Sequence, residues 1–187
     1  MLQRLLGGSG APDELDTLPQ PLPFVAKADS EAVRQLVESG FVIRKVSQGS
    51  ELLVVDFTGR GRVTNAAWAA LARIAAQTRS LNLYNAGVAD ENLNELSHFV
   101  NLTQLRLESN PVGDDGVAHL TSLRALVSLN LVNTKVGDEG VTKLAALPML
   151  RRLYLWRSSV SPAKIAALRQ ARPDFELIGG VQMTISR

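Results

Sequence analysis

Acidic side chains recur in this chain at an interval of 24 residues, and each of them is followed by a second acid: Asp90-Glu91, Asp114-Asp115 and Asp138-Glu139. A stack of carboxylates could bind calcium, which prefers oxygen ligands. Acids in the first turn of a helix also stabilise that helix, because its N-terminal end carries partial positive charge. These stretches lack the carboxylate and carbonyl density of a calcium loop. We therefore favour the helical interpretation and expect no metal site.

Other chemistry-bearing residues are sparse. The two histidines, His98 and His119, fall at different phases of successive repeats, and we expect both to be solvated rather than to act as metal ligands or general bases. The chain has no cysteine, which excludes disulfides, thiolate zinc sites and covalent haem attachment. It also lacks the G-x-S-x-G, Walker A and H-E-x-x-H motifs. The sequence therefore predicts a protein without catalytic residues and without a cofactor.

Composition limits the remaining classes. The 187 residues suit one domain, and a hydrophobic content of 45% suits a packed core. The net charge of only +2 argues against a dedicated nucleic-acid binder. No apolar run is long enough to span a membrane, and the N-terminus shows no signal peptide. We expect a monomeric domain with a protein partner, no nucleic acid and no membrane span.

Internal repetition explains the 24-residue interval. The clearest pair of copies is Leu102, Leu105, Leu107, Asn110, Val112, Gly116, Val117, Leu120, Leu123 and then Leu126, Leu129, Leu131, Thr134, Val136, Gly140, Val141, Leu144, Leu147. Further copies begin at Thr78 and Leu150. A looser fifth copy runs from Leu52 to Ile74 with offsets of 25 and 26, and we expect extra residues near Gly59-Arg60-Gly61 to absorb the difference.

The pattern L-x-x-L-x-L-x-x-N/T/S-x-V followed by an amphipathic helix resembles the leucine-rich repeat. Alternating leucines face the interior of a short strand, and the helix stripe packs behind them. A single repeat cannot bury its apolar face alone, whereas stacked repeats share one core. The sequence thus predicts an α/β leucine-rich-repeat solenoid, a right-handed arc of about five 24-residue repeats. Its parallel sheet should be concave and its helices convex.

The ends of the chain should differ from its middle, because solenoids need caps. We expect an N-terminal cap over residues 29–50, with a helix at 29–39 that has Ser30 as its N-cap, then a strand at 41–43 and a hairpin turn at 47–50. The repeats then occupy 51–173. Residues 174–187 predict a cap strand and tail, and residues 1–28, rich in proline and glycine, predict a flexible linker.

The strand face that points away from the core is the candidate binding surface. It carries three of the chain's four tyrosines and tryptophans, together with arginines, and these residue types dominate interface energies. Trp156 beside Arg152 and Arg157 is its densest cluster, although Trp156 could instead cover the end of the array. Six basic residues and no acid lie between 151 and 172, which could meet an acidic partner or simply solubilise the end. The predicted contact residues are Asn82, Tyr84, Gln104, Arg106, Glu108, Asn130, Arg152, Tyr154, Trp156 and Arg157.

Two functions fit such a face. The first is a non-catalytic protein-interaction module. The second is a carbohydrate or polymer binder, in which stacked aromatics and the amides of Asn82, Gln104 and Asn130 would hold sugars.

Several motifs are similar to those of bacterial leucine-rich-repeat domains fused to c-type cytochrome domains. They are the strand Leu153-Tyr154-Leu155-Trp156, the loop Val160-Ser161-Pro162 and the stretch Ala171–Ile178. The resemblance implies a recognition module within a larger membrane-associated redox protein, with no catalytic residues in the repeats. It would place the domain in the periplasm or outside the cell, whereas without the fusion we would expect the cytoplasm. No haem-attachment motif lies in this chain, so electron transfer is not assigned to it.

Overall fold

In a computed structural model, which describes residues 25–179, the strands form one seven-stranded sheet whose spatial order is the sequence order. The strands are β1 (Phe41–Lys45), β2 (Leu53–Phe57), β3 (Thr78–Asn82), β4 (Gln104–Arg106), β5 (Ser128–Asn130), β6 (Arg152–Tyr154) and β7 (Glu176–Ile178). β1 pairs antiparallel with β2, and every later pair is parallel. Each strand therefore lies beside the strand that precedes it in sequence, as a solenoid requires.

The register carries the 24-residue interval into three dimensions. Leu81 pairs with Leu105, Leu105 with Leu129, Leu129 with Leu153 and Leu153 with Leu177. All five leucines are buried, because side chains alternate across a strand and this phase faces the helices. The residues on either side of each leucine consequently face away from the core.

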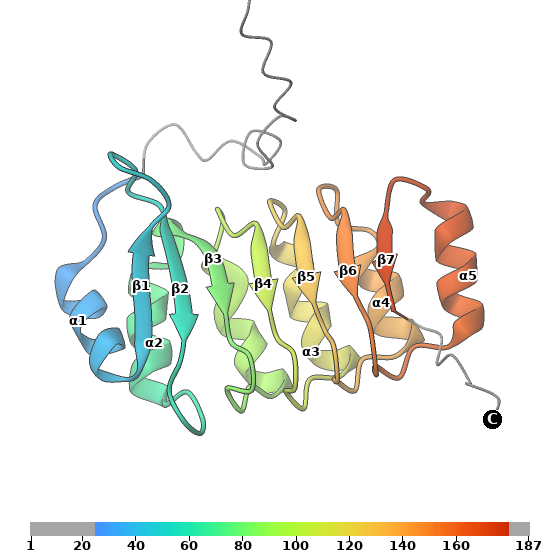
Figure 1. The fold of residues 1–187 in the computed structure, drawn as a ribbon, viewed down its shortest axis with the longest axis horizontal. Helices are drawn as coiled ribbons and strands as arrows, with labels where there is room; N and C mark the ends of the chain where they lie inside the picture. The colour runs from blue at the N-terminus through green and yellow to red at the C-terminus, as the bar shows by residue number, and fades with distance from the viewer. Residues whose placement is uncertain (1–24, 180–187) are drawn as a thin grey trace, which may run out of the picture.

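Helical segments form the second layer, behind the sheet and at its ends (Figure 1). They are α1 (Ser30–Glu38), α2 (Asn65–Arg73), η1 (Ala75–Gln77), η2 (Asp90–His98), α3 (Asp114–His119), η3 (Leu120–Ser122), α4 (Asp138–Leu144) and α5 (Pro162–Ala171). η2 is a 3₁₀ helix, which matches its apolar spacing of three residues, Leu93, Leu96 and Phe99, all buried. The core fills the space between the two layers.

The N-terminal end corrects one predicted detail. The predicted helix is present as α1, but its N-cap is Asp29 rather than Ser30, because the Asp29 carboxylate accepts hydrogen bonds from the N–H groups of Glu31 and Ala32. Most of the predicted linker lies outside the described residues. Its last residues contact the domain: Gln77 Nε2 donates to the Ala26 carbonyl at 3.0 Å, and Ala28 packs on the core.

The looser first repeat accommodates its extra residues at two places, and the sequence predicts just the one near Gly59-Arg60-Gly61. One lies in the 58–62 loop, since Phe57 to Val63 is one residue longer than Leu83 to Val88. The other lies at the start of β3, where the register shifts between Leu53 and Val54. A bulge absorbs an extra residue without reversing the buried face of the strand.

Hydrogen bonds between consecutive repeats explain the acidic interval. The Asp90 carboxylate accepts from the Gly113 N–H at 2.7 Å. In the same way Asp114 accepts from Gly137 at 2.6 Å, and Asp138 accepts from the N–H and hydroxyl of Ser161 at 2.7 Å each. We call these contacts the aspartate staples. Each one satisfies an N–H of the repeat that follows.

The turn after each strand repeats as well. Asn85, Ser109, Asn133 and Arg157 each adopt a left-handed conformation, with φ between 48° and 59°. In the last three of these turns the side chain of the next residue, Asn110, Thr134 or Ser158, hydrogen-bonds to the turn backbone, most extensively at the buried Asn110. Its side-chain oxygen accepts from the backbone N–H groups of Ala86 and Val88 in the preceding repeat. Its side-chain nitrogen donates to the backbone carbonyls of Leu83, Leu107 and Glu108.

Candidate functional site

The sheet surface opposite the helices, here called the strand face, consists of three columns of side chains. The strand register defines the first two columns: Val54, Ser80, Gln104, Ser128, Arg152, Glu176 and Val42, Asp56, Asn82, Arg106, Asn130, Tyr154, Ile178. The third column follows the strands and contains Thr58, Tyr84, Glu108, Val132 and Trp156. With strands about 4.8 Å apart, the face is roughly 30 Å long. The structure therefore places nine of the ten predicted contact residues in these columns, and the tenth, Arg157, lies on the turn directly after Trp156.

Polar side chains at the centre of the strand face hold one another. Arg106 donates to Glu108 Oε1 through Nε and a terminal nitrogen at 2.9 and 2.7 Å, and Asn130 Nδ2 donates to the same oxygen at 2.8 Å. Glu108 is only 6% exposed, although the alternation of the strand predicts an open position. Its carboxylate raises the pKa of the Arg106 guanidinium by hydrogen bonding. Glu108 thus positions Arg106 and Asn130, and Arg106 is the exposed member of the cluster.

Two of the predicted amides also serve the turns. The side-chain oxygens of Asn82 and Asn130 accept from the N–H groups of Tyr84 and Val132, each at 3.1 Å. This bond two residues onward is the typical Asx turn, which fixes the asparagine side chain. Asn130 therefore uses both ends of its amide within the protein.

Exposed apolar surface collects on the same face. Six large hydrophobic side chains in the described part of the chain are exposed, and four of them belong to the strand face: Val42, Tyr84, Trp156 and Ile178. Tyr84 is 53% and Trp156 45% exposed. Tyr154 is half-buried beside them. Large exposed aromatics on a rigid sheet lose little entropy on binding, which makes them effective anchors.

The basic C-terminal end is largely engaged in structural contacts. Arg172 pairs with Asp174 and donates to the Ala145 carbonyl, Arg151 lies 3.7 Å from Asp174, and Arg169 donates to the Leu177 carbonyl. Arg157, by contrast, is exposed on the left-handed turn after Trp156. The cluster that sequence reasoning singled out therefore lies together at this end: half-buried Arg152 and Tyr154 with exposed Trp156 and Arg157.

The remaining chemistry-bearing residues form no reactive arrangement in residues 25–179. His98 and His119 are both exposed, and no group of three or more histidines and carboxylates there could hold a metal ion. None of the helices in that part of the chain is long and apolar enough to cross a membrane. What the strand face offers chemically is exposed apolar contact area together with hydrogen-bonding side chains of both charge signs.

Comparison with known proteins supports the repeat class. A family model described as a leucine-rich repeat matches residues 100–120 and 118–145. Among solved structures, actin-binding site 2 of leiomodin-1 is 16% identical, with 56% of this chain and 72% of that chain covered and a TM-score of 0.45. An internalin from Listeria monocytogenes is 20% identical, with 60% and 37% covered and a TM-score of 0.41. No curated protein matches the sequence. Leucine-rich repeats are thus matched over residues 100–145, and the described strands stack in sequence order into a sheet that is parallel from β2 to β7.

Proposed function

We propose that this leucine-rich-repeat domain is a non-catalytic protein-interaction module that holds a protein partner on its strand face. The main support is that four of the six exposed large hydrophobic side chains in the described part of the chain lie on the strand face. The four lie on β1, after β3, after β6 and on β7, and exposed aromatics of this kind contribute most of the binding energy in protein interfaces. Leucine-rich repeats are typically a binding fold rather than a catalytic one, which agrees with the residues present.

A protein partner fits this face better than a sugar does. Sugar recognition needs amide groups that are free to exchange hydrogen bonds with hydroxyls. Asn130 already donates to Glu108 and accepts from Val132, and the Asn82 oxygen accepts from Tyr84. The accessible groups that remain are mainly the aromatic side chains and the arginines, which are enriched at the centres of protein interfaces.

The test is site-specific photo-crosslinking in an extract of the source organism. A benzophenone amino acid replaces Tyr84 or Trp156 on the strand face, and in the controls it replaces Val37 or Val100, which are similarly exposed away from it. We expect a discrete crosslinked protein from the strand-face positions only. Unlabelled wild-type protein added as a competitor should abolish the crosslinked product. The Tyr84→Ala/Trp156→Ala double variant added in the same way should leave the product unchanged.

Equal crosslinking from the control positions would contradict the proposal. Crosslinking at Val37 or Val100, with none at the strand-face positions, would contradict it as well. Circular dichroism melts of each variant establish that the domain is folded. These positions are exposed, so their replacement should change the stability by less than about 0.5 kcal/mol.

We also propose, from the motif resemblance alone, that the domain is part of a larger c-type cytochrome protein. The observation that tests this is the sequence of the native gene around it. A Cys-x-x-Cys-His segment in the same reading frame supports the proposal, and its absence refutes it.

A further inference from the structure

We propose a second binding site on the helical layer, a hollow between α2 and η2 that accepts the side chain of a lysine or arginine from a polypeptide. The hollow is lined by Asn65, Trp68, Ala69, Glu91, Asn92 and Glu95 and has a volume of about 230 Å³. That is smaller than the roughly 300–1,000 Å³ of pockets for drug-sized ligands, and it suits one side chain. It lies on the layer opposite the strand face.

The hollow exists because one aspartate staple is missing. Between η2 and α3, and again between α3 and α4, an aspartate bonds to the backbone of the next repeat, and a glycine packs directly against it. A Cβ on Gly116 would lie 2.3 Å from Asp90 Oδ1, which shows how closely those repeats approach. In the first repeat Asn65 stands at the aspartate position, and Asn92 stands where Gly116 and Gly140 stand later.

These two asparagines leave the space open. Asn92 uses its side-chain oxygen within its own repeat, accepting from the Ala89 N–H at 2.9 Å, so that N–H is no longer available to Asn65. The Asn65 side chain makes no hydrogen bond to any residue between 25 and 179. The contact that closes the later repeats is therefore replaced by two side-chain amides that face the hollow.

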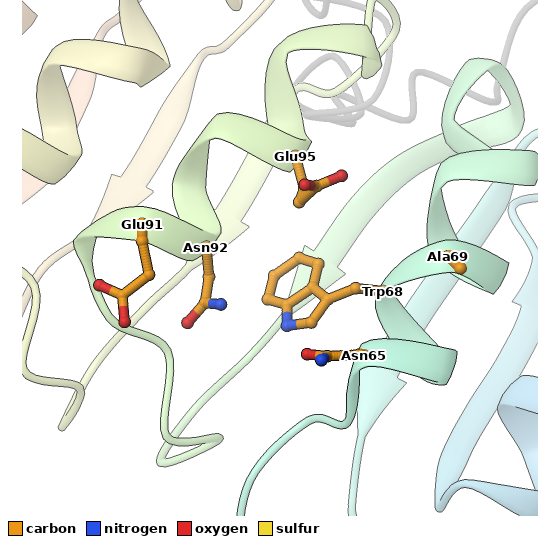
Figure 2. A pocket seen from close by; sticks show the side chains of 6 residues that line it. All are labelled: Asn65, Trp68, Ala69, Glu91, Asn92 and Glu95. Carbon is orange, nitrogen blue, oxygen red and sulfur yellow. The ribbon is translucent and has the colours of Figure 1, made fainter.

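The lining carries unsatisfied groups of complementary kinds. Figure 2 shows the indole of Trp68 between Asn65 and Glu95, with Asn92 and Glu91 across from it on η2. Trp68 is only 5% exposed, yet its indole N–H has no hydrogen-bond partner among the described residues. Neither Glu91 nor Glu95 forms an ion pair with a described residue. The N–H is not sealed inside the core, because it is not among the buried side-chain atoms that lack a partner, so it can donate to an acceptor that a ligand brings into the hollow.

A basic side chain in a polypeptide satisfies all of these groups. Its ammonium or guanidinium would lie near the two carboxylates, and its methylene stem would pack against the indole, where a cation is also favoured. A backbone carbonyl of the same segment would accept from the Trp68 N–H. A free organic cation would satisfy the carboxylates and not the indole N–H, so we expect it to bind more weakly.

The experiment measures spectroscopic signals that come from Trp68 itself. In a Trp156→Phe protein Trp68 is the sole tryptophan, because the chain contains two. Its fluorescence, and the NMR resonance of its indole N–H, are measured against acetyl-Gly-Arg-Gly-amide, acetyl-Gly-Lys-Gly-amide, methylguanidinium and butylammonium at constant ionic strength. We expect saturable changes in both signals with the peptides, at lower concentrations than with the free cations.

A matched control distinguishes binding in the hollow from attraction of the cation to negative charge elsewhere on the surface. The Glu91→Gln/Glu95→Gln protein should bind at least about five-fold more weakly, because it loses both ion pairs. The Asp115→Asn/Glu139→Gln protein loses the same charge at first-turn positions of later repeats, outside the hollow, and should bind normally. Equal weakening in both variants, or no saturable change in either signal with any probe, would overturn the proposal. Equal binding of peptides and free cations would overturn the polypeptide assignment. None of these outcomes bears on the strand face.

Discussion

Replacing Asn110 with threonine tests how the repeats are held together behind the strand face. The Asn110 amide accepts from the N–H groups of Ala86 and Val88 at 3.1 and 2.9 Å, and donates to the carbonyl oxygens of Leu83, Leu107 and Glu108. Threonine already occupies the equivalent position in the next repeat, where the Thr134 hydroxyl donates to the Leu131 carbonyl at 2.7 Å. A threonine at 110 can therefore keep one donated bond.

The two accepted bonds decide the magnitude. A threonine hydroxyl is too short to accept from both N–H groups of the preceding repeat, and Ala86 and Val88 are buried, at 0% and 1% exposure. Each buried N–H left without a partner costs about 1–3 kcal/mol. After partial relaxation we expect the Asn110→Thr protein to lose about 2–4 kcal/mol of unfolding free energy. At a urea m-value of about 2 kcal/mol/M, the midpoint falls by about 1–2 M.

Urea unfolding monitored by circular dichroism measures the loss, and the exposed Asn94 provides the matched control. The Asn94→Thr protein should change by less than about 0.5 kcal/mol, because the Asn94 side chain makes no hydrogen bond within the described residues. Hydrogen exchange should accelerate at the amides of Ala86 and Val88 in Asn110→Thr only. A midpoint equal to that of Asn94→Thr, with an unchanged m-value, would refute the reasoning.

Three further predictions concern contacts between and beyond the repeats. Gly140→Ala should cost about 1–3 kcal/mol of stability in urea unfolding, because the new Cβ would lie 2.4 Å from Asp114 Oδ1; a neutral effect would show that the staple yields easily. Hydrogen bonds from Ser161, the N-cap of the next helix, hold the pKa of Asp138 below its usual 3.8, so the contribution of Asp138 to stability is complete above pH 3.8 and is lost as the pH falls through the lower pKa of the folded state. The difference in melting temperature between wild type and Asp138→Asn should therefore shrink from pH 6 to pH 3, and a constant difference would contradict this. Arg169→Ala should expose the Leu177 carbonyl at the edge of β7 that pairs with no other strand of residues 25–179. We expect this to cause concentration-dependent association in sedimentation velocity, which Arg169→Lys should largely prevent.

The sequence was most informative where contacts repeat. Leucines at a fixed interval predict which face of each strand is buried, and the pairing of Leu105 with Leu129 follows from that interval. It was least informative where one repeat contacts the next. Asp90, Asp114 and Asp138 suggested a calcium site or a favourable interaction with the helix dipole, whereas their actual partners are backbone N–H groups that come 23 residues later in the chain.

The sequence predicts which side chains share the strand face, but it does not predict how they contact one another. Alternation alone predicts that Glu108 is open to solvent, but hydrogen bonds from Arg106 and Asn130 draw it to 6% exposure. The hollow beside Trp68 was not predicted. Trp68 fits the apolar pattern, and the signal that could have revealed the hollow was the replacement of the staple residues by Asn65 and Asn92.

The aspartate staples also run in one direction, and this makes the 24-residue segment a self-contained unit of growth. Each middle repeat offers a carboxylate to its successor and a backbone N–H to its predecessor, as Asp114 and Gly137 do. An exact copy of residues 114–137 inserted after position 137 would find both partners already in place, and its leucines would continue the same core. Lengthening the array therefore requires no new kind of contact. It would extend the strand face by about 4.8 Å for each copy, and the two distinct ends would keep their own contacts.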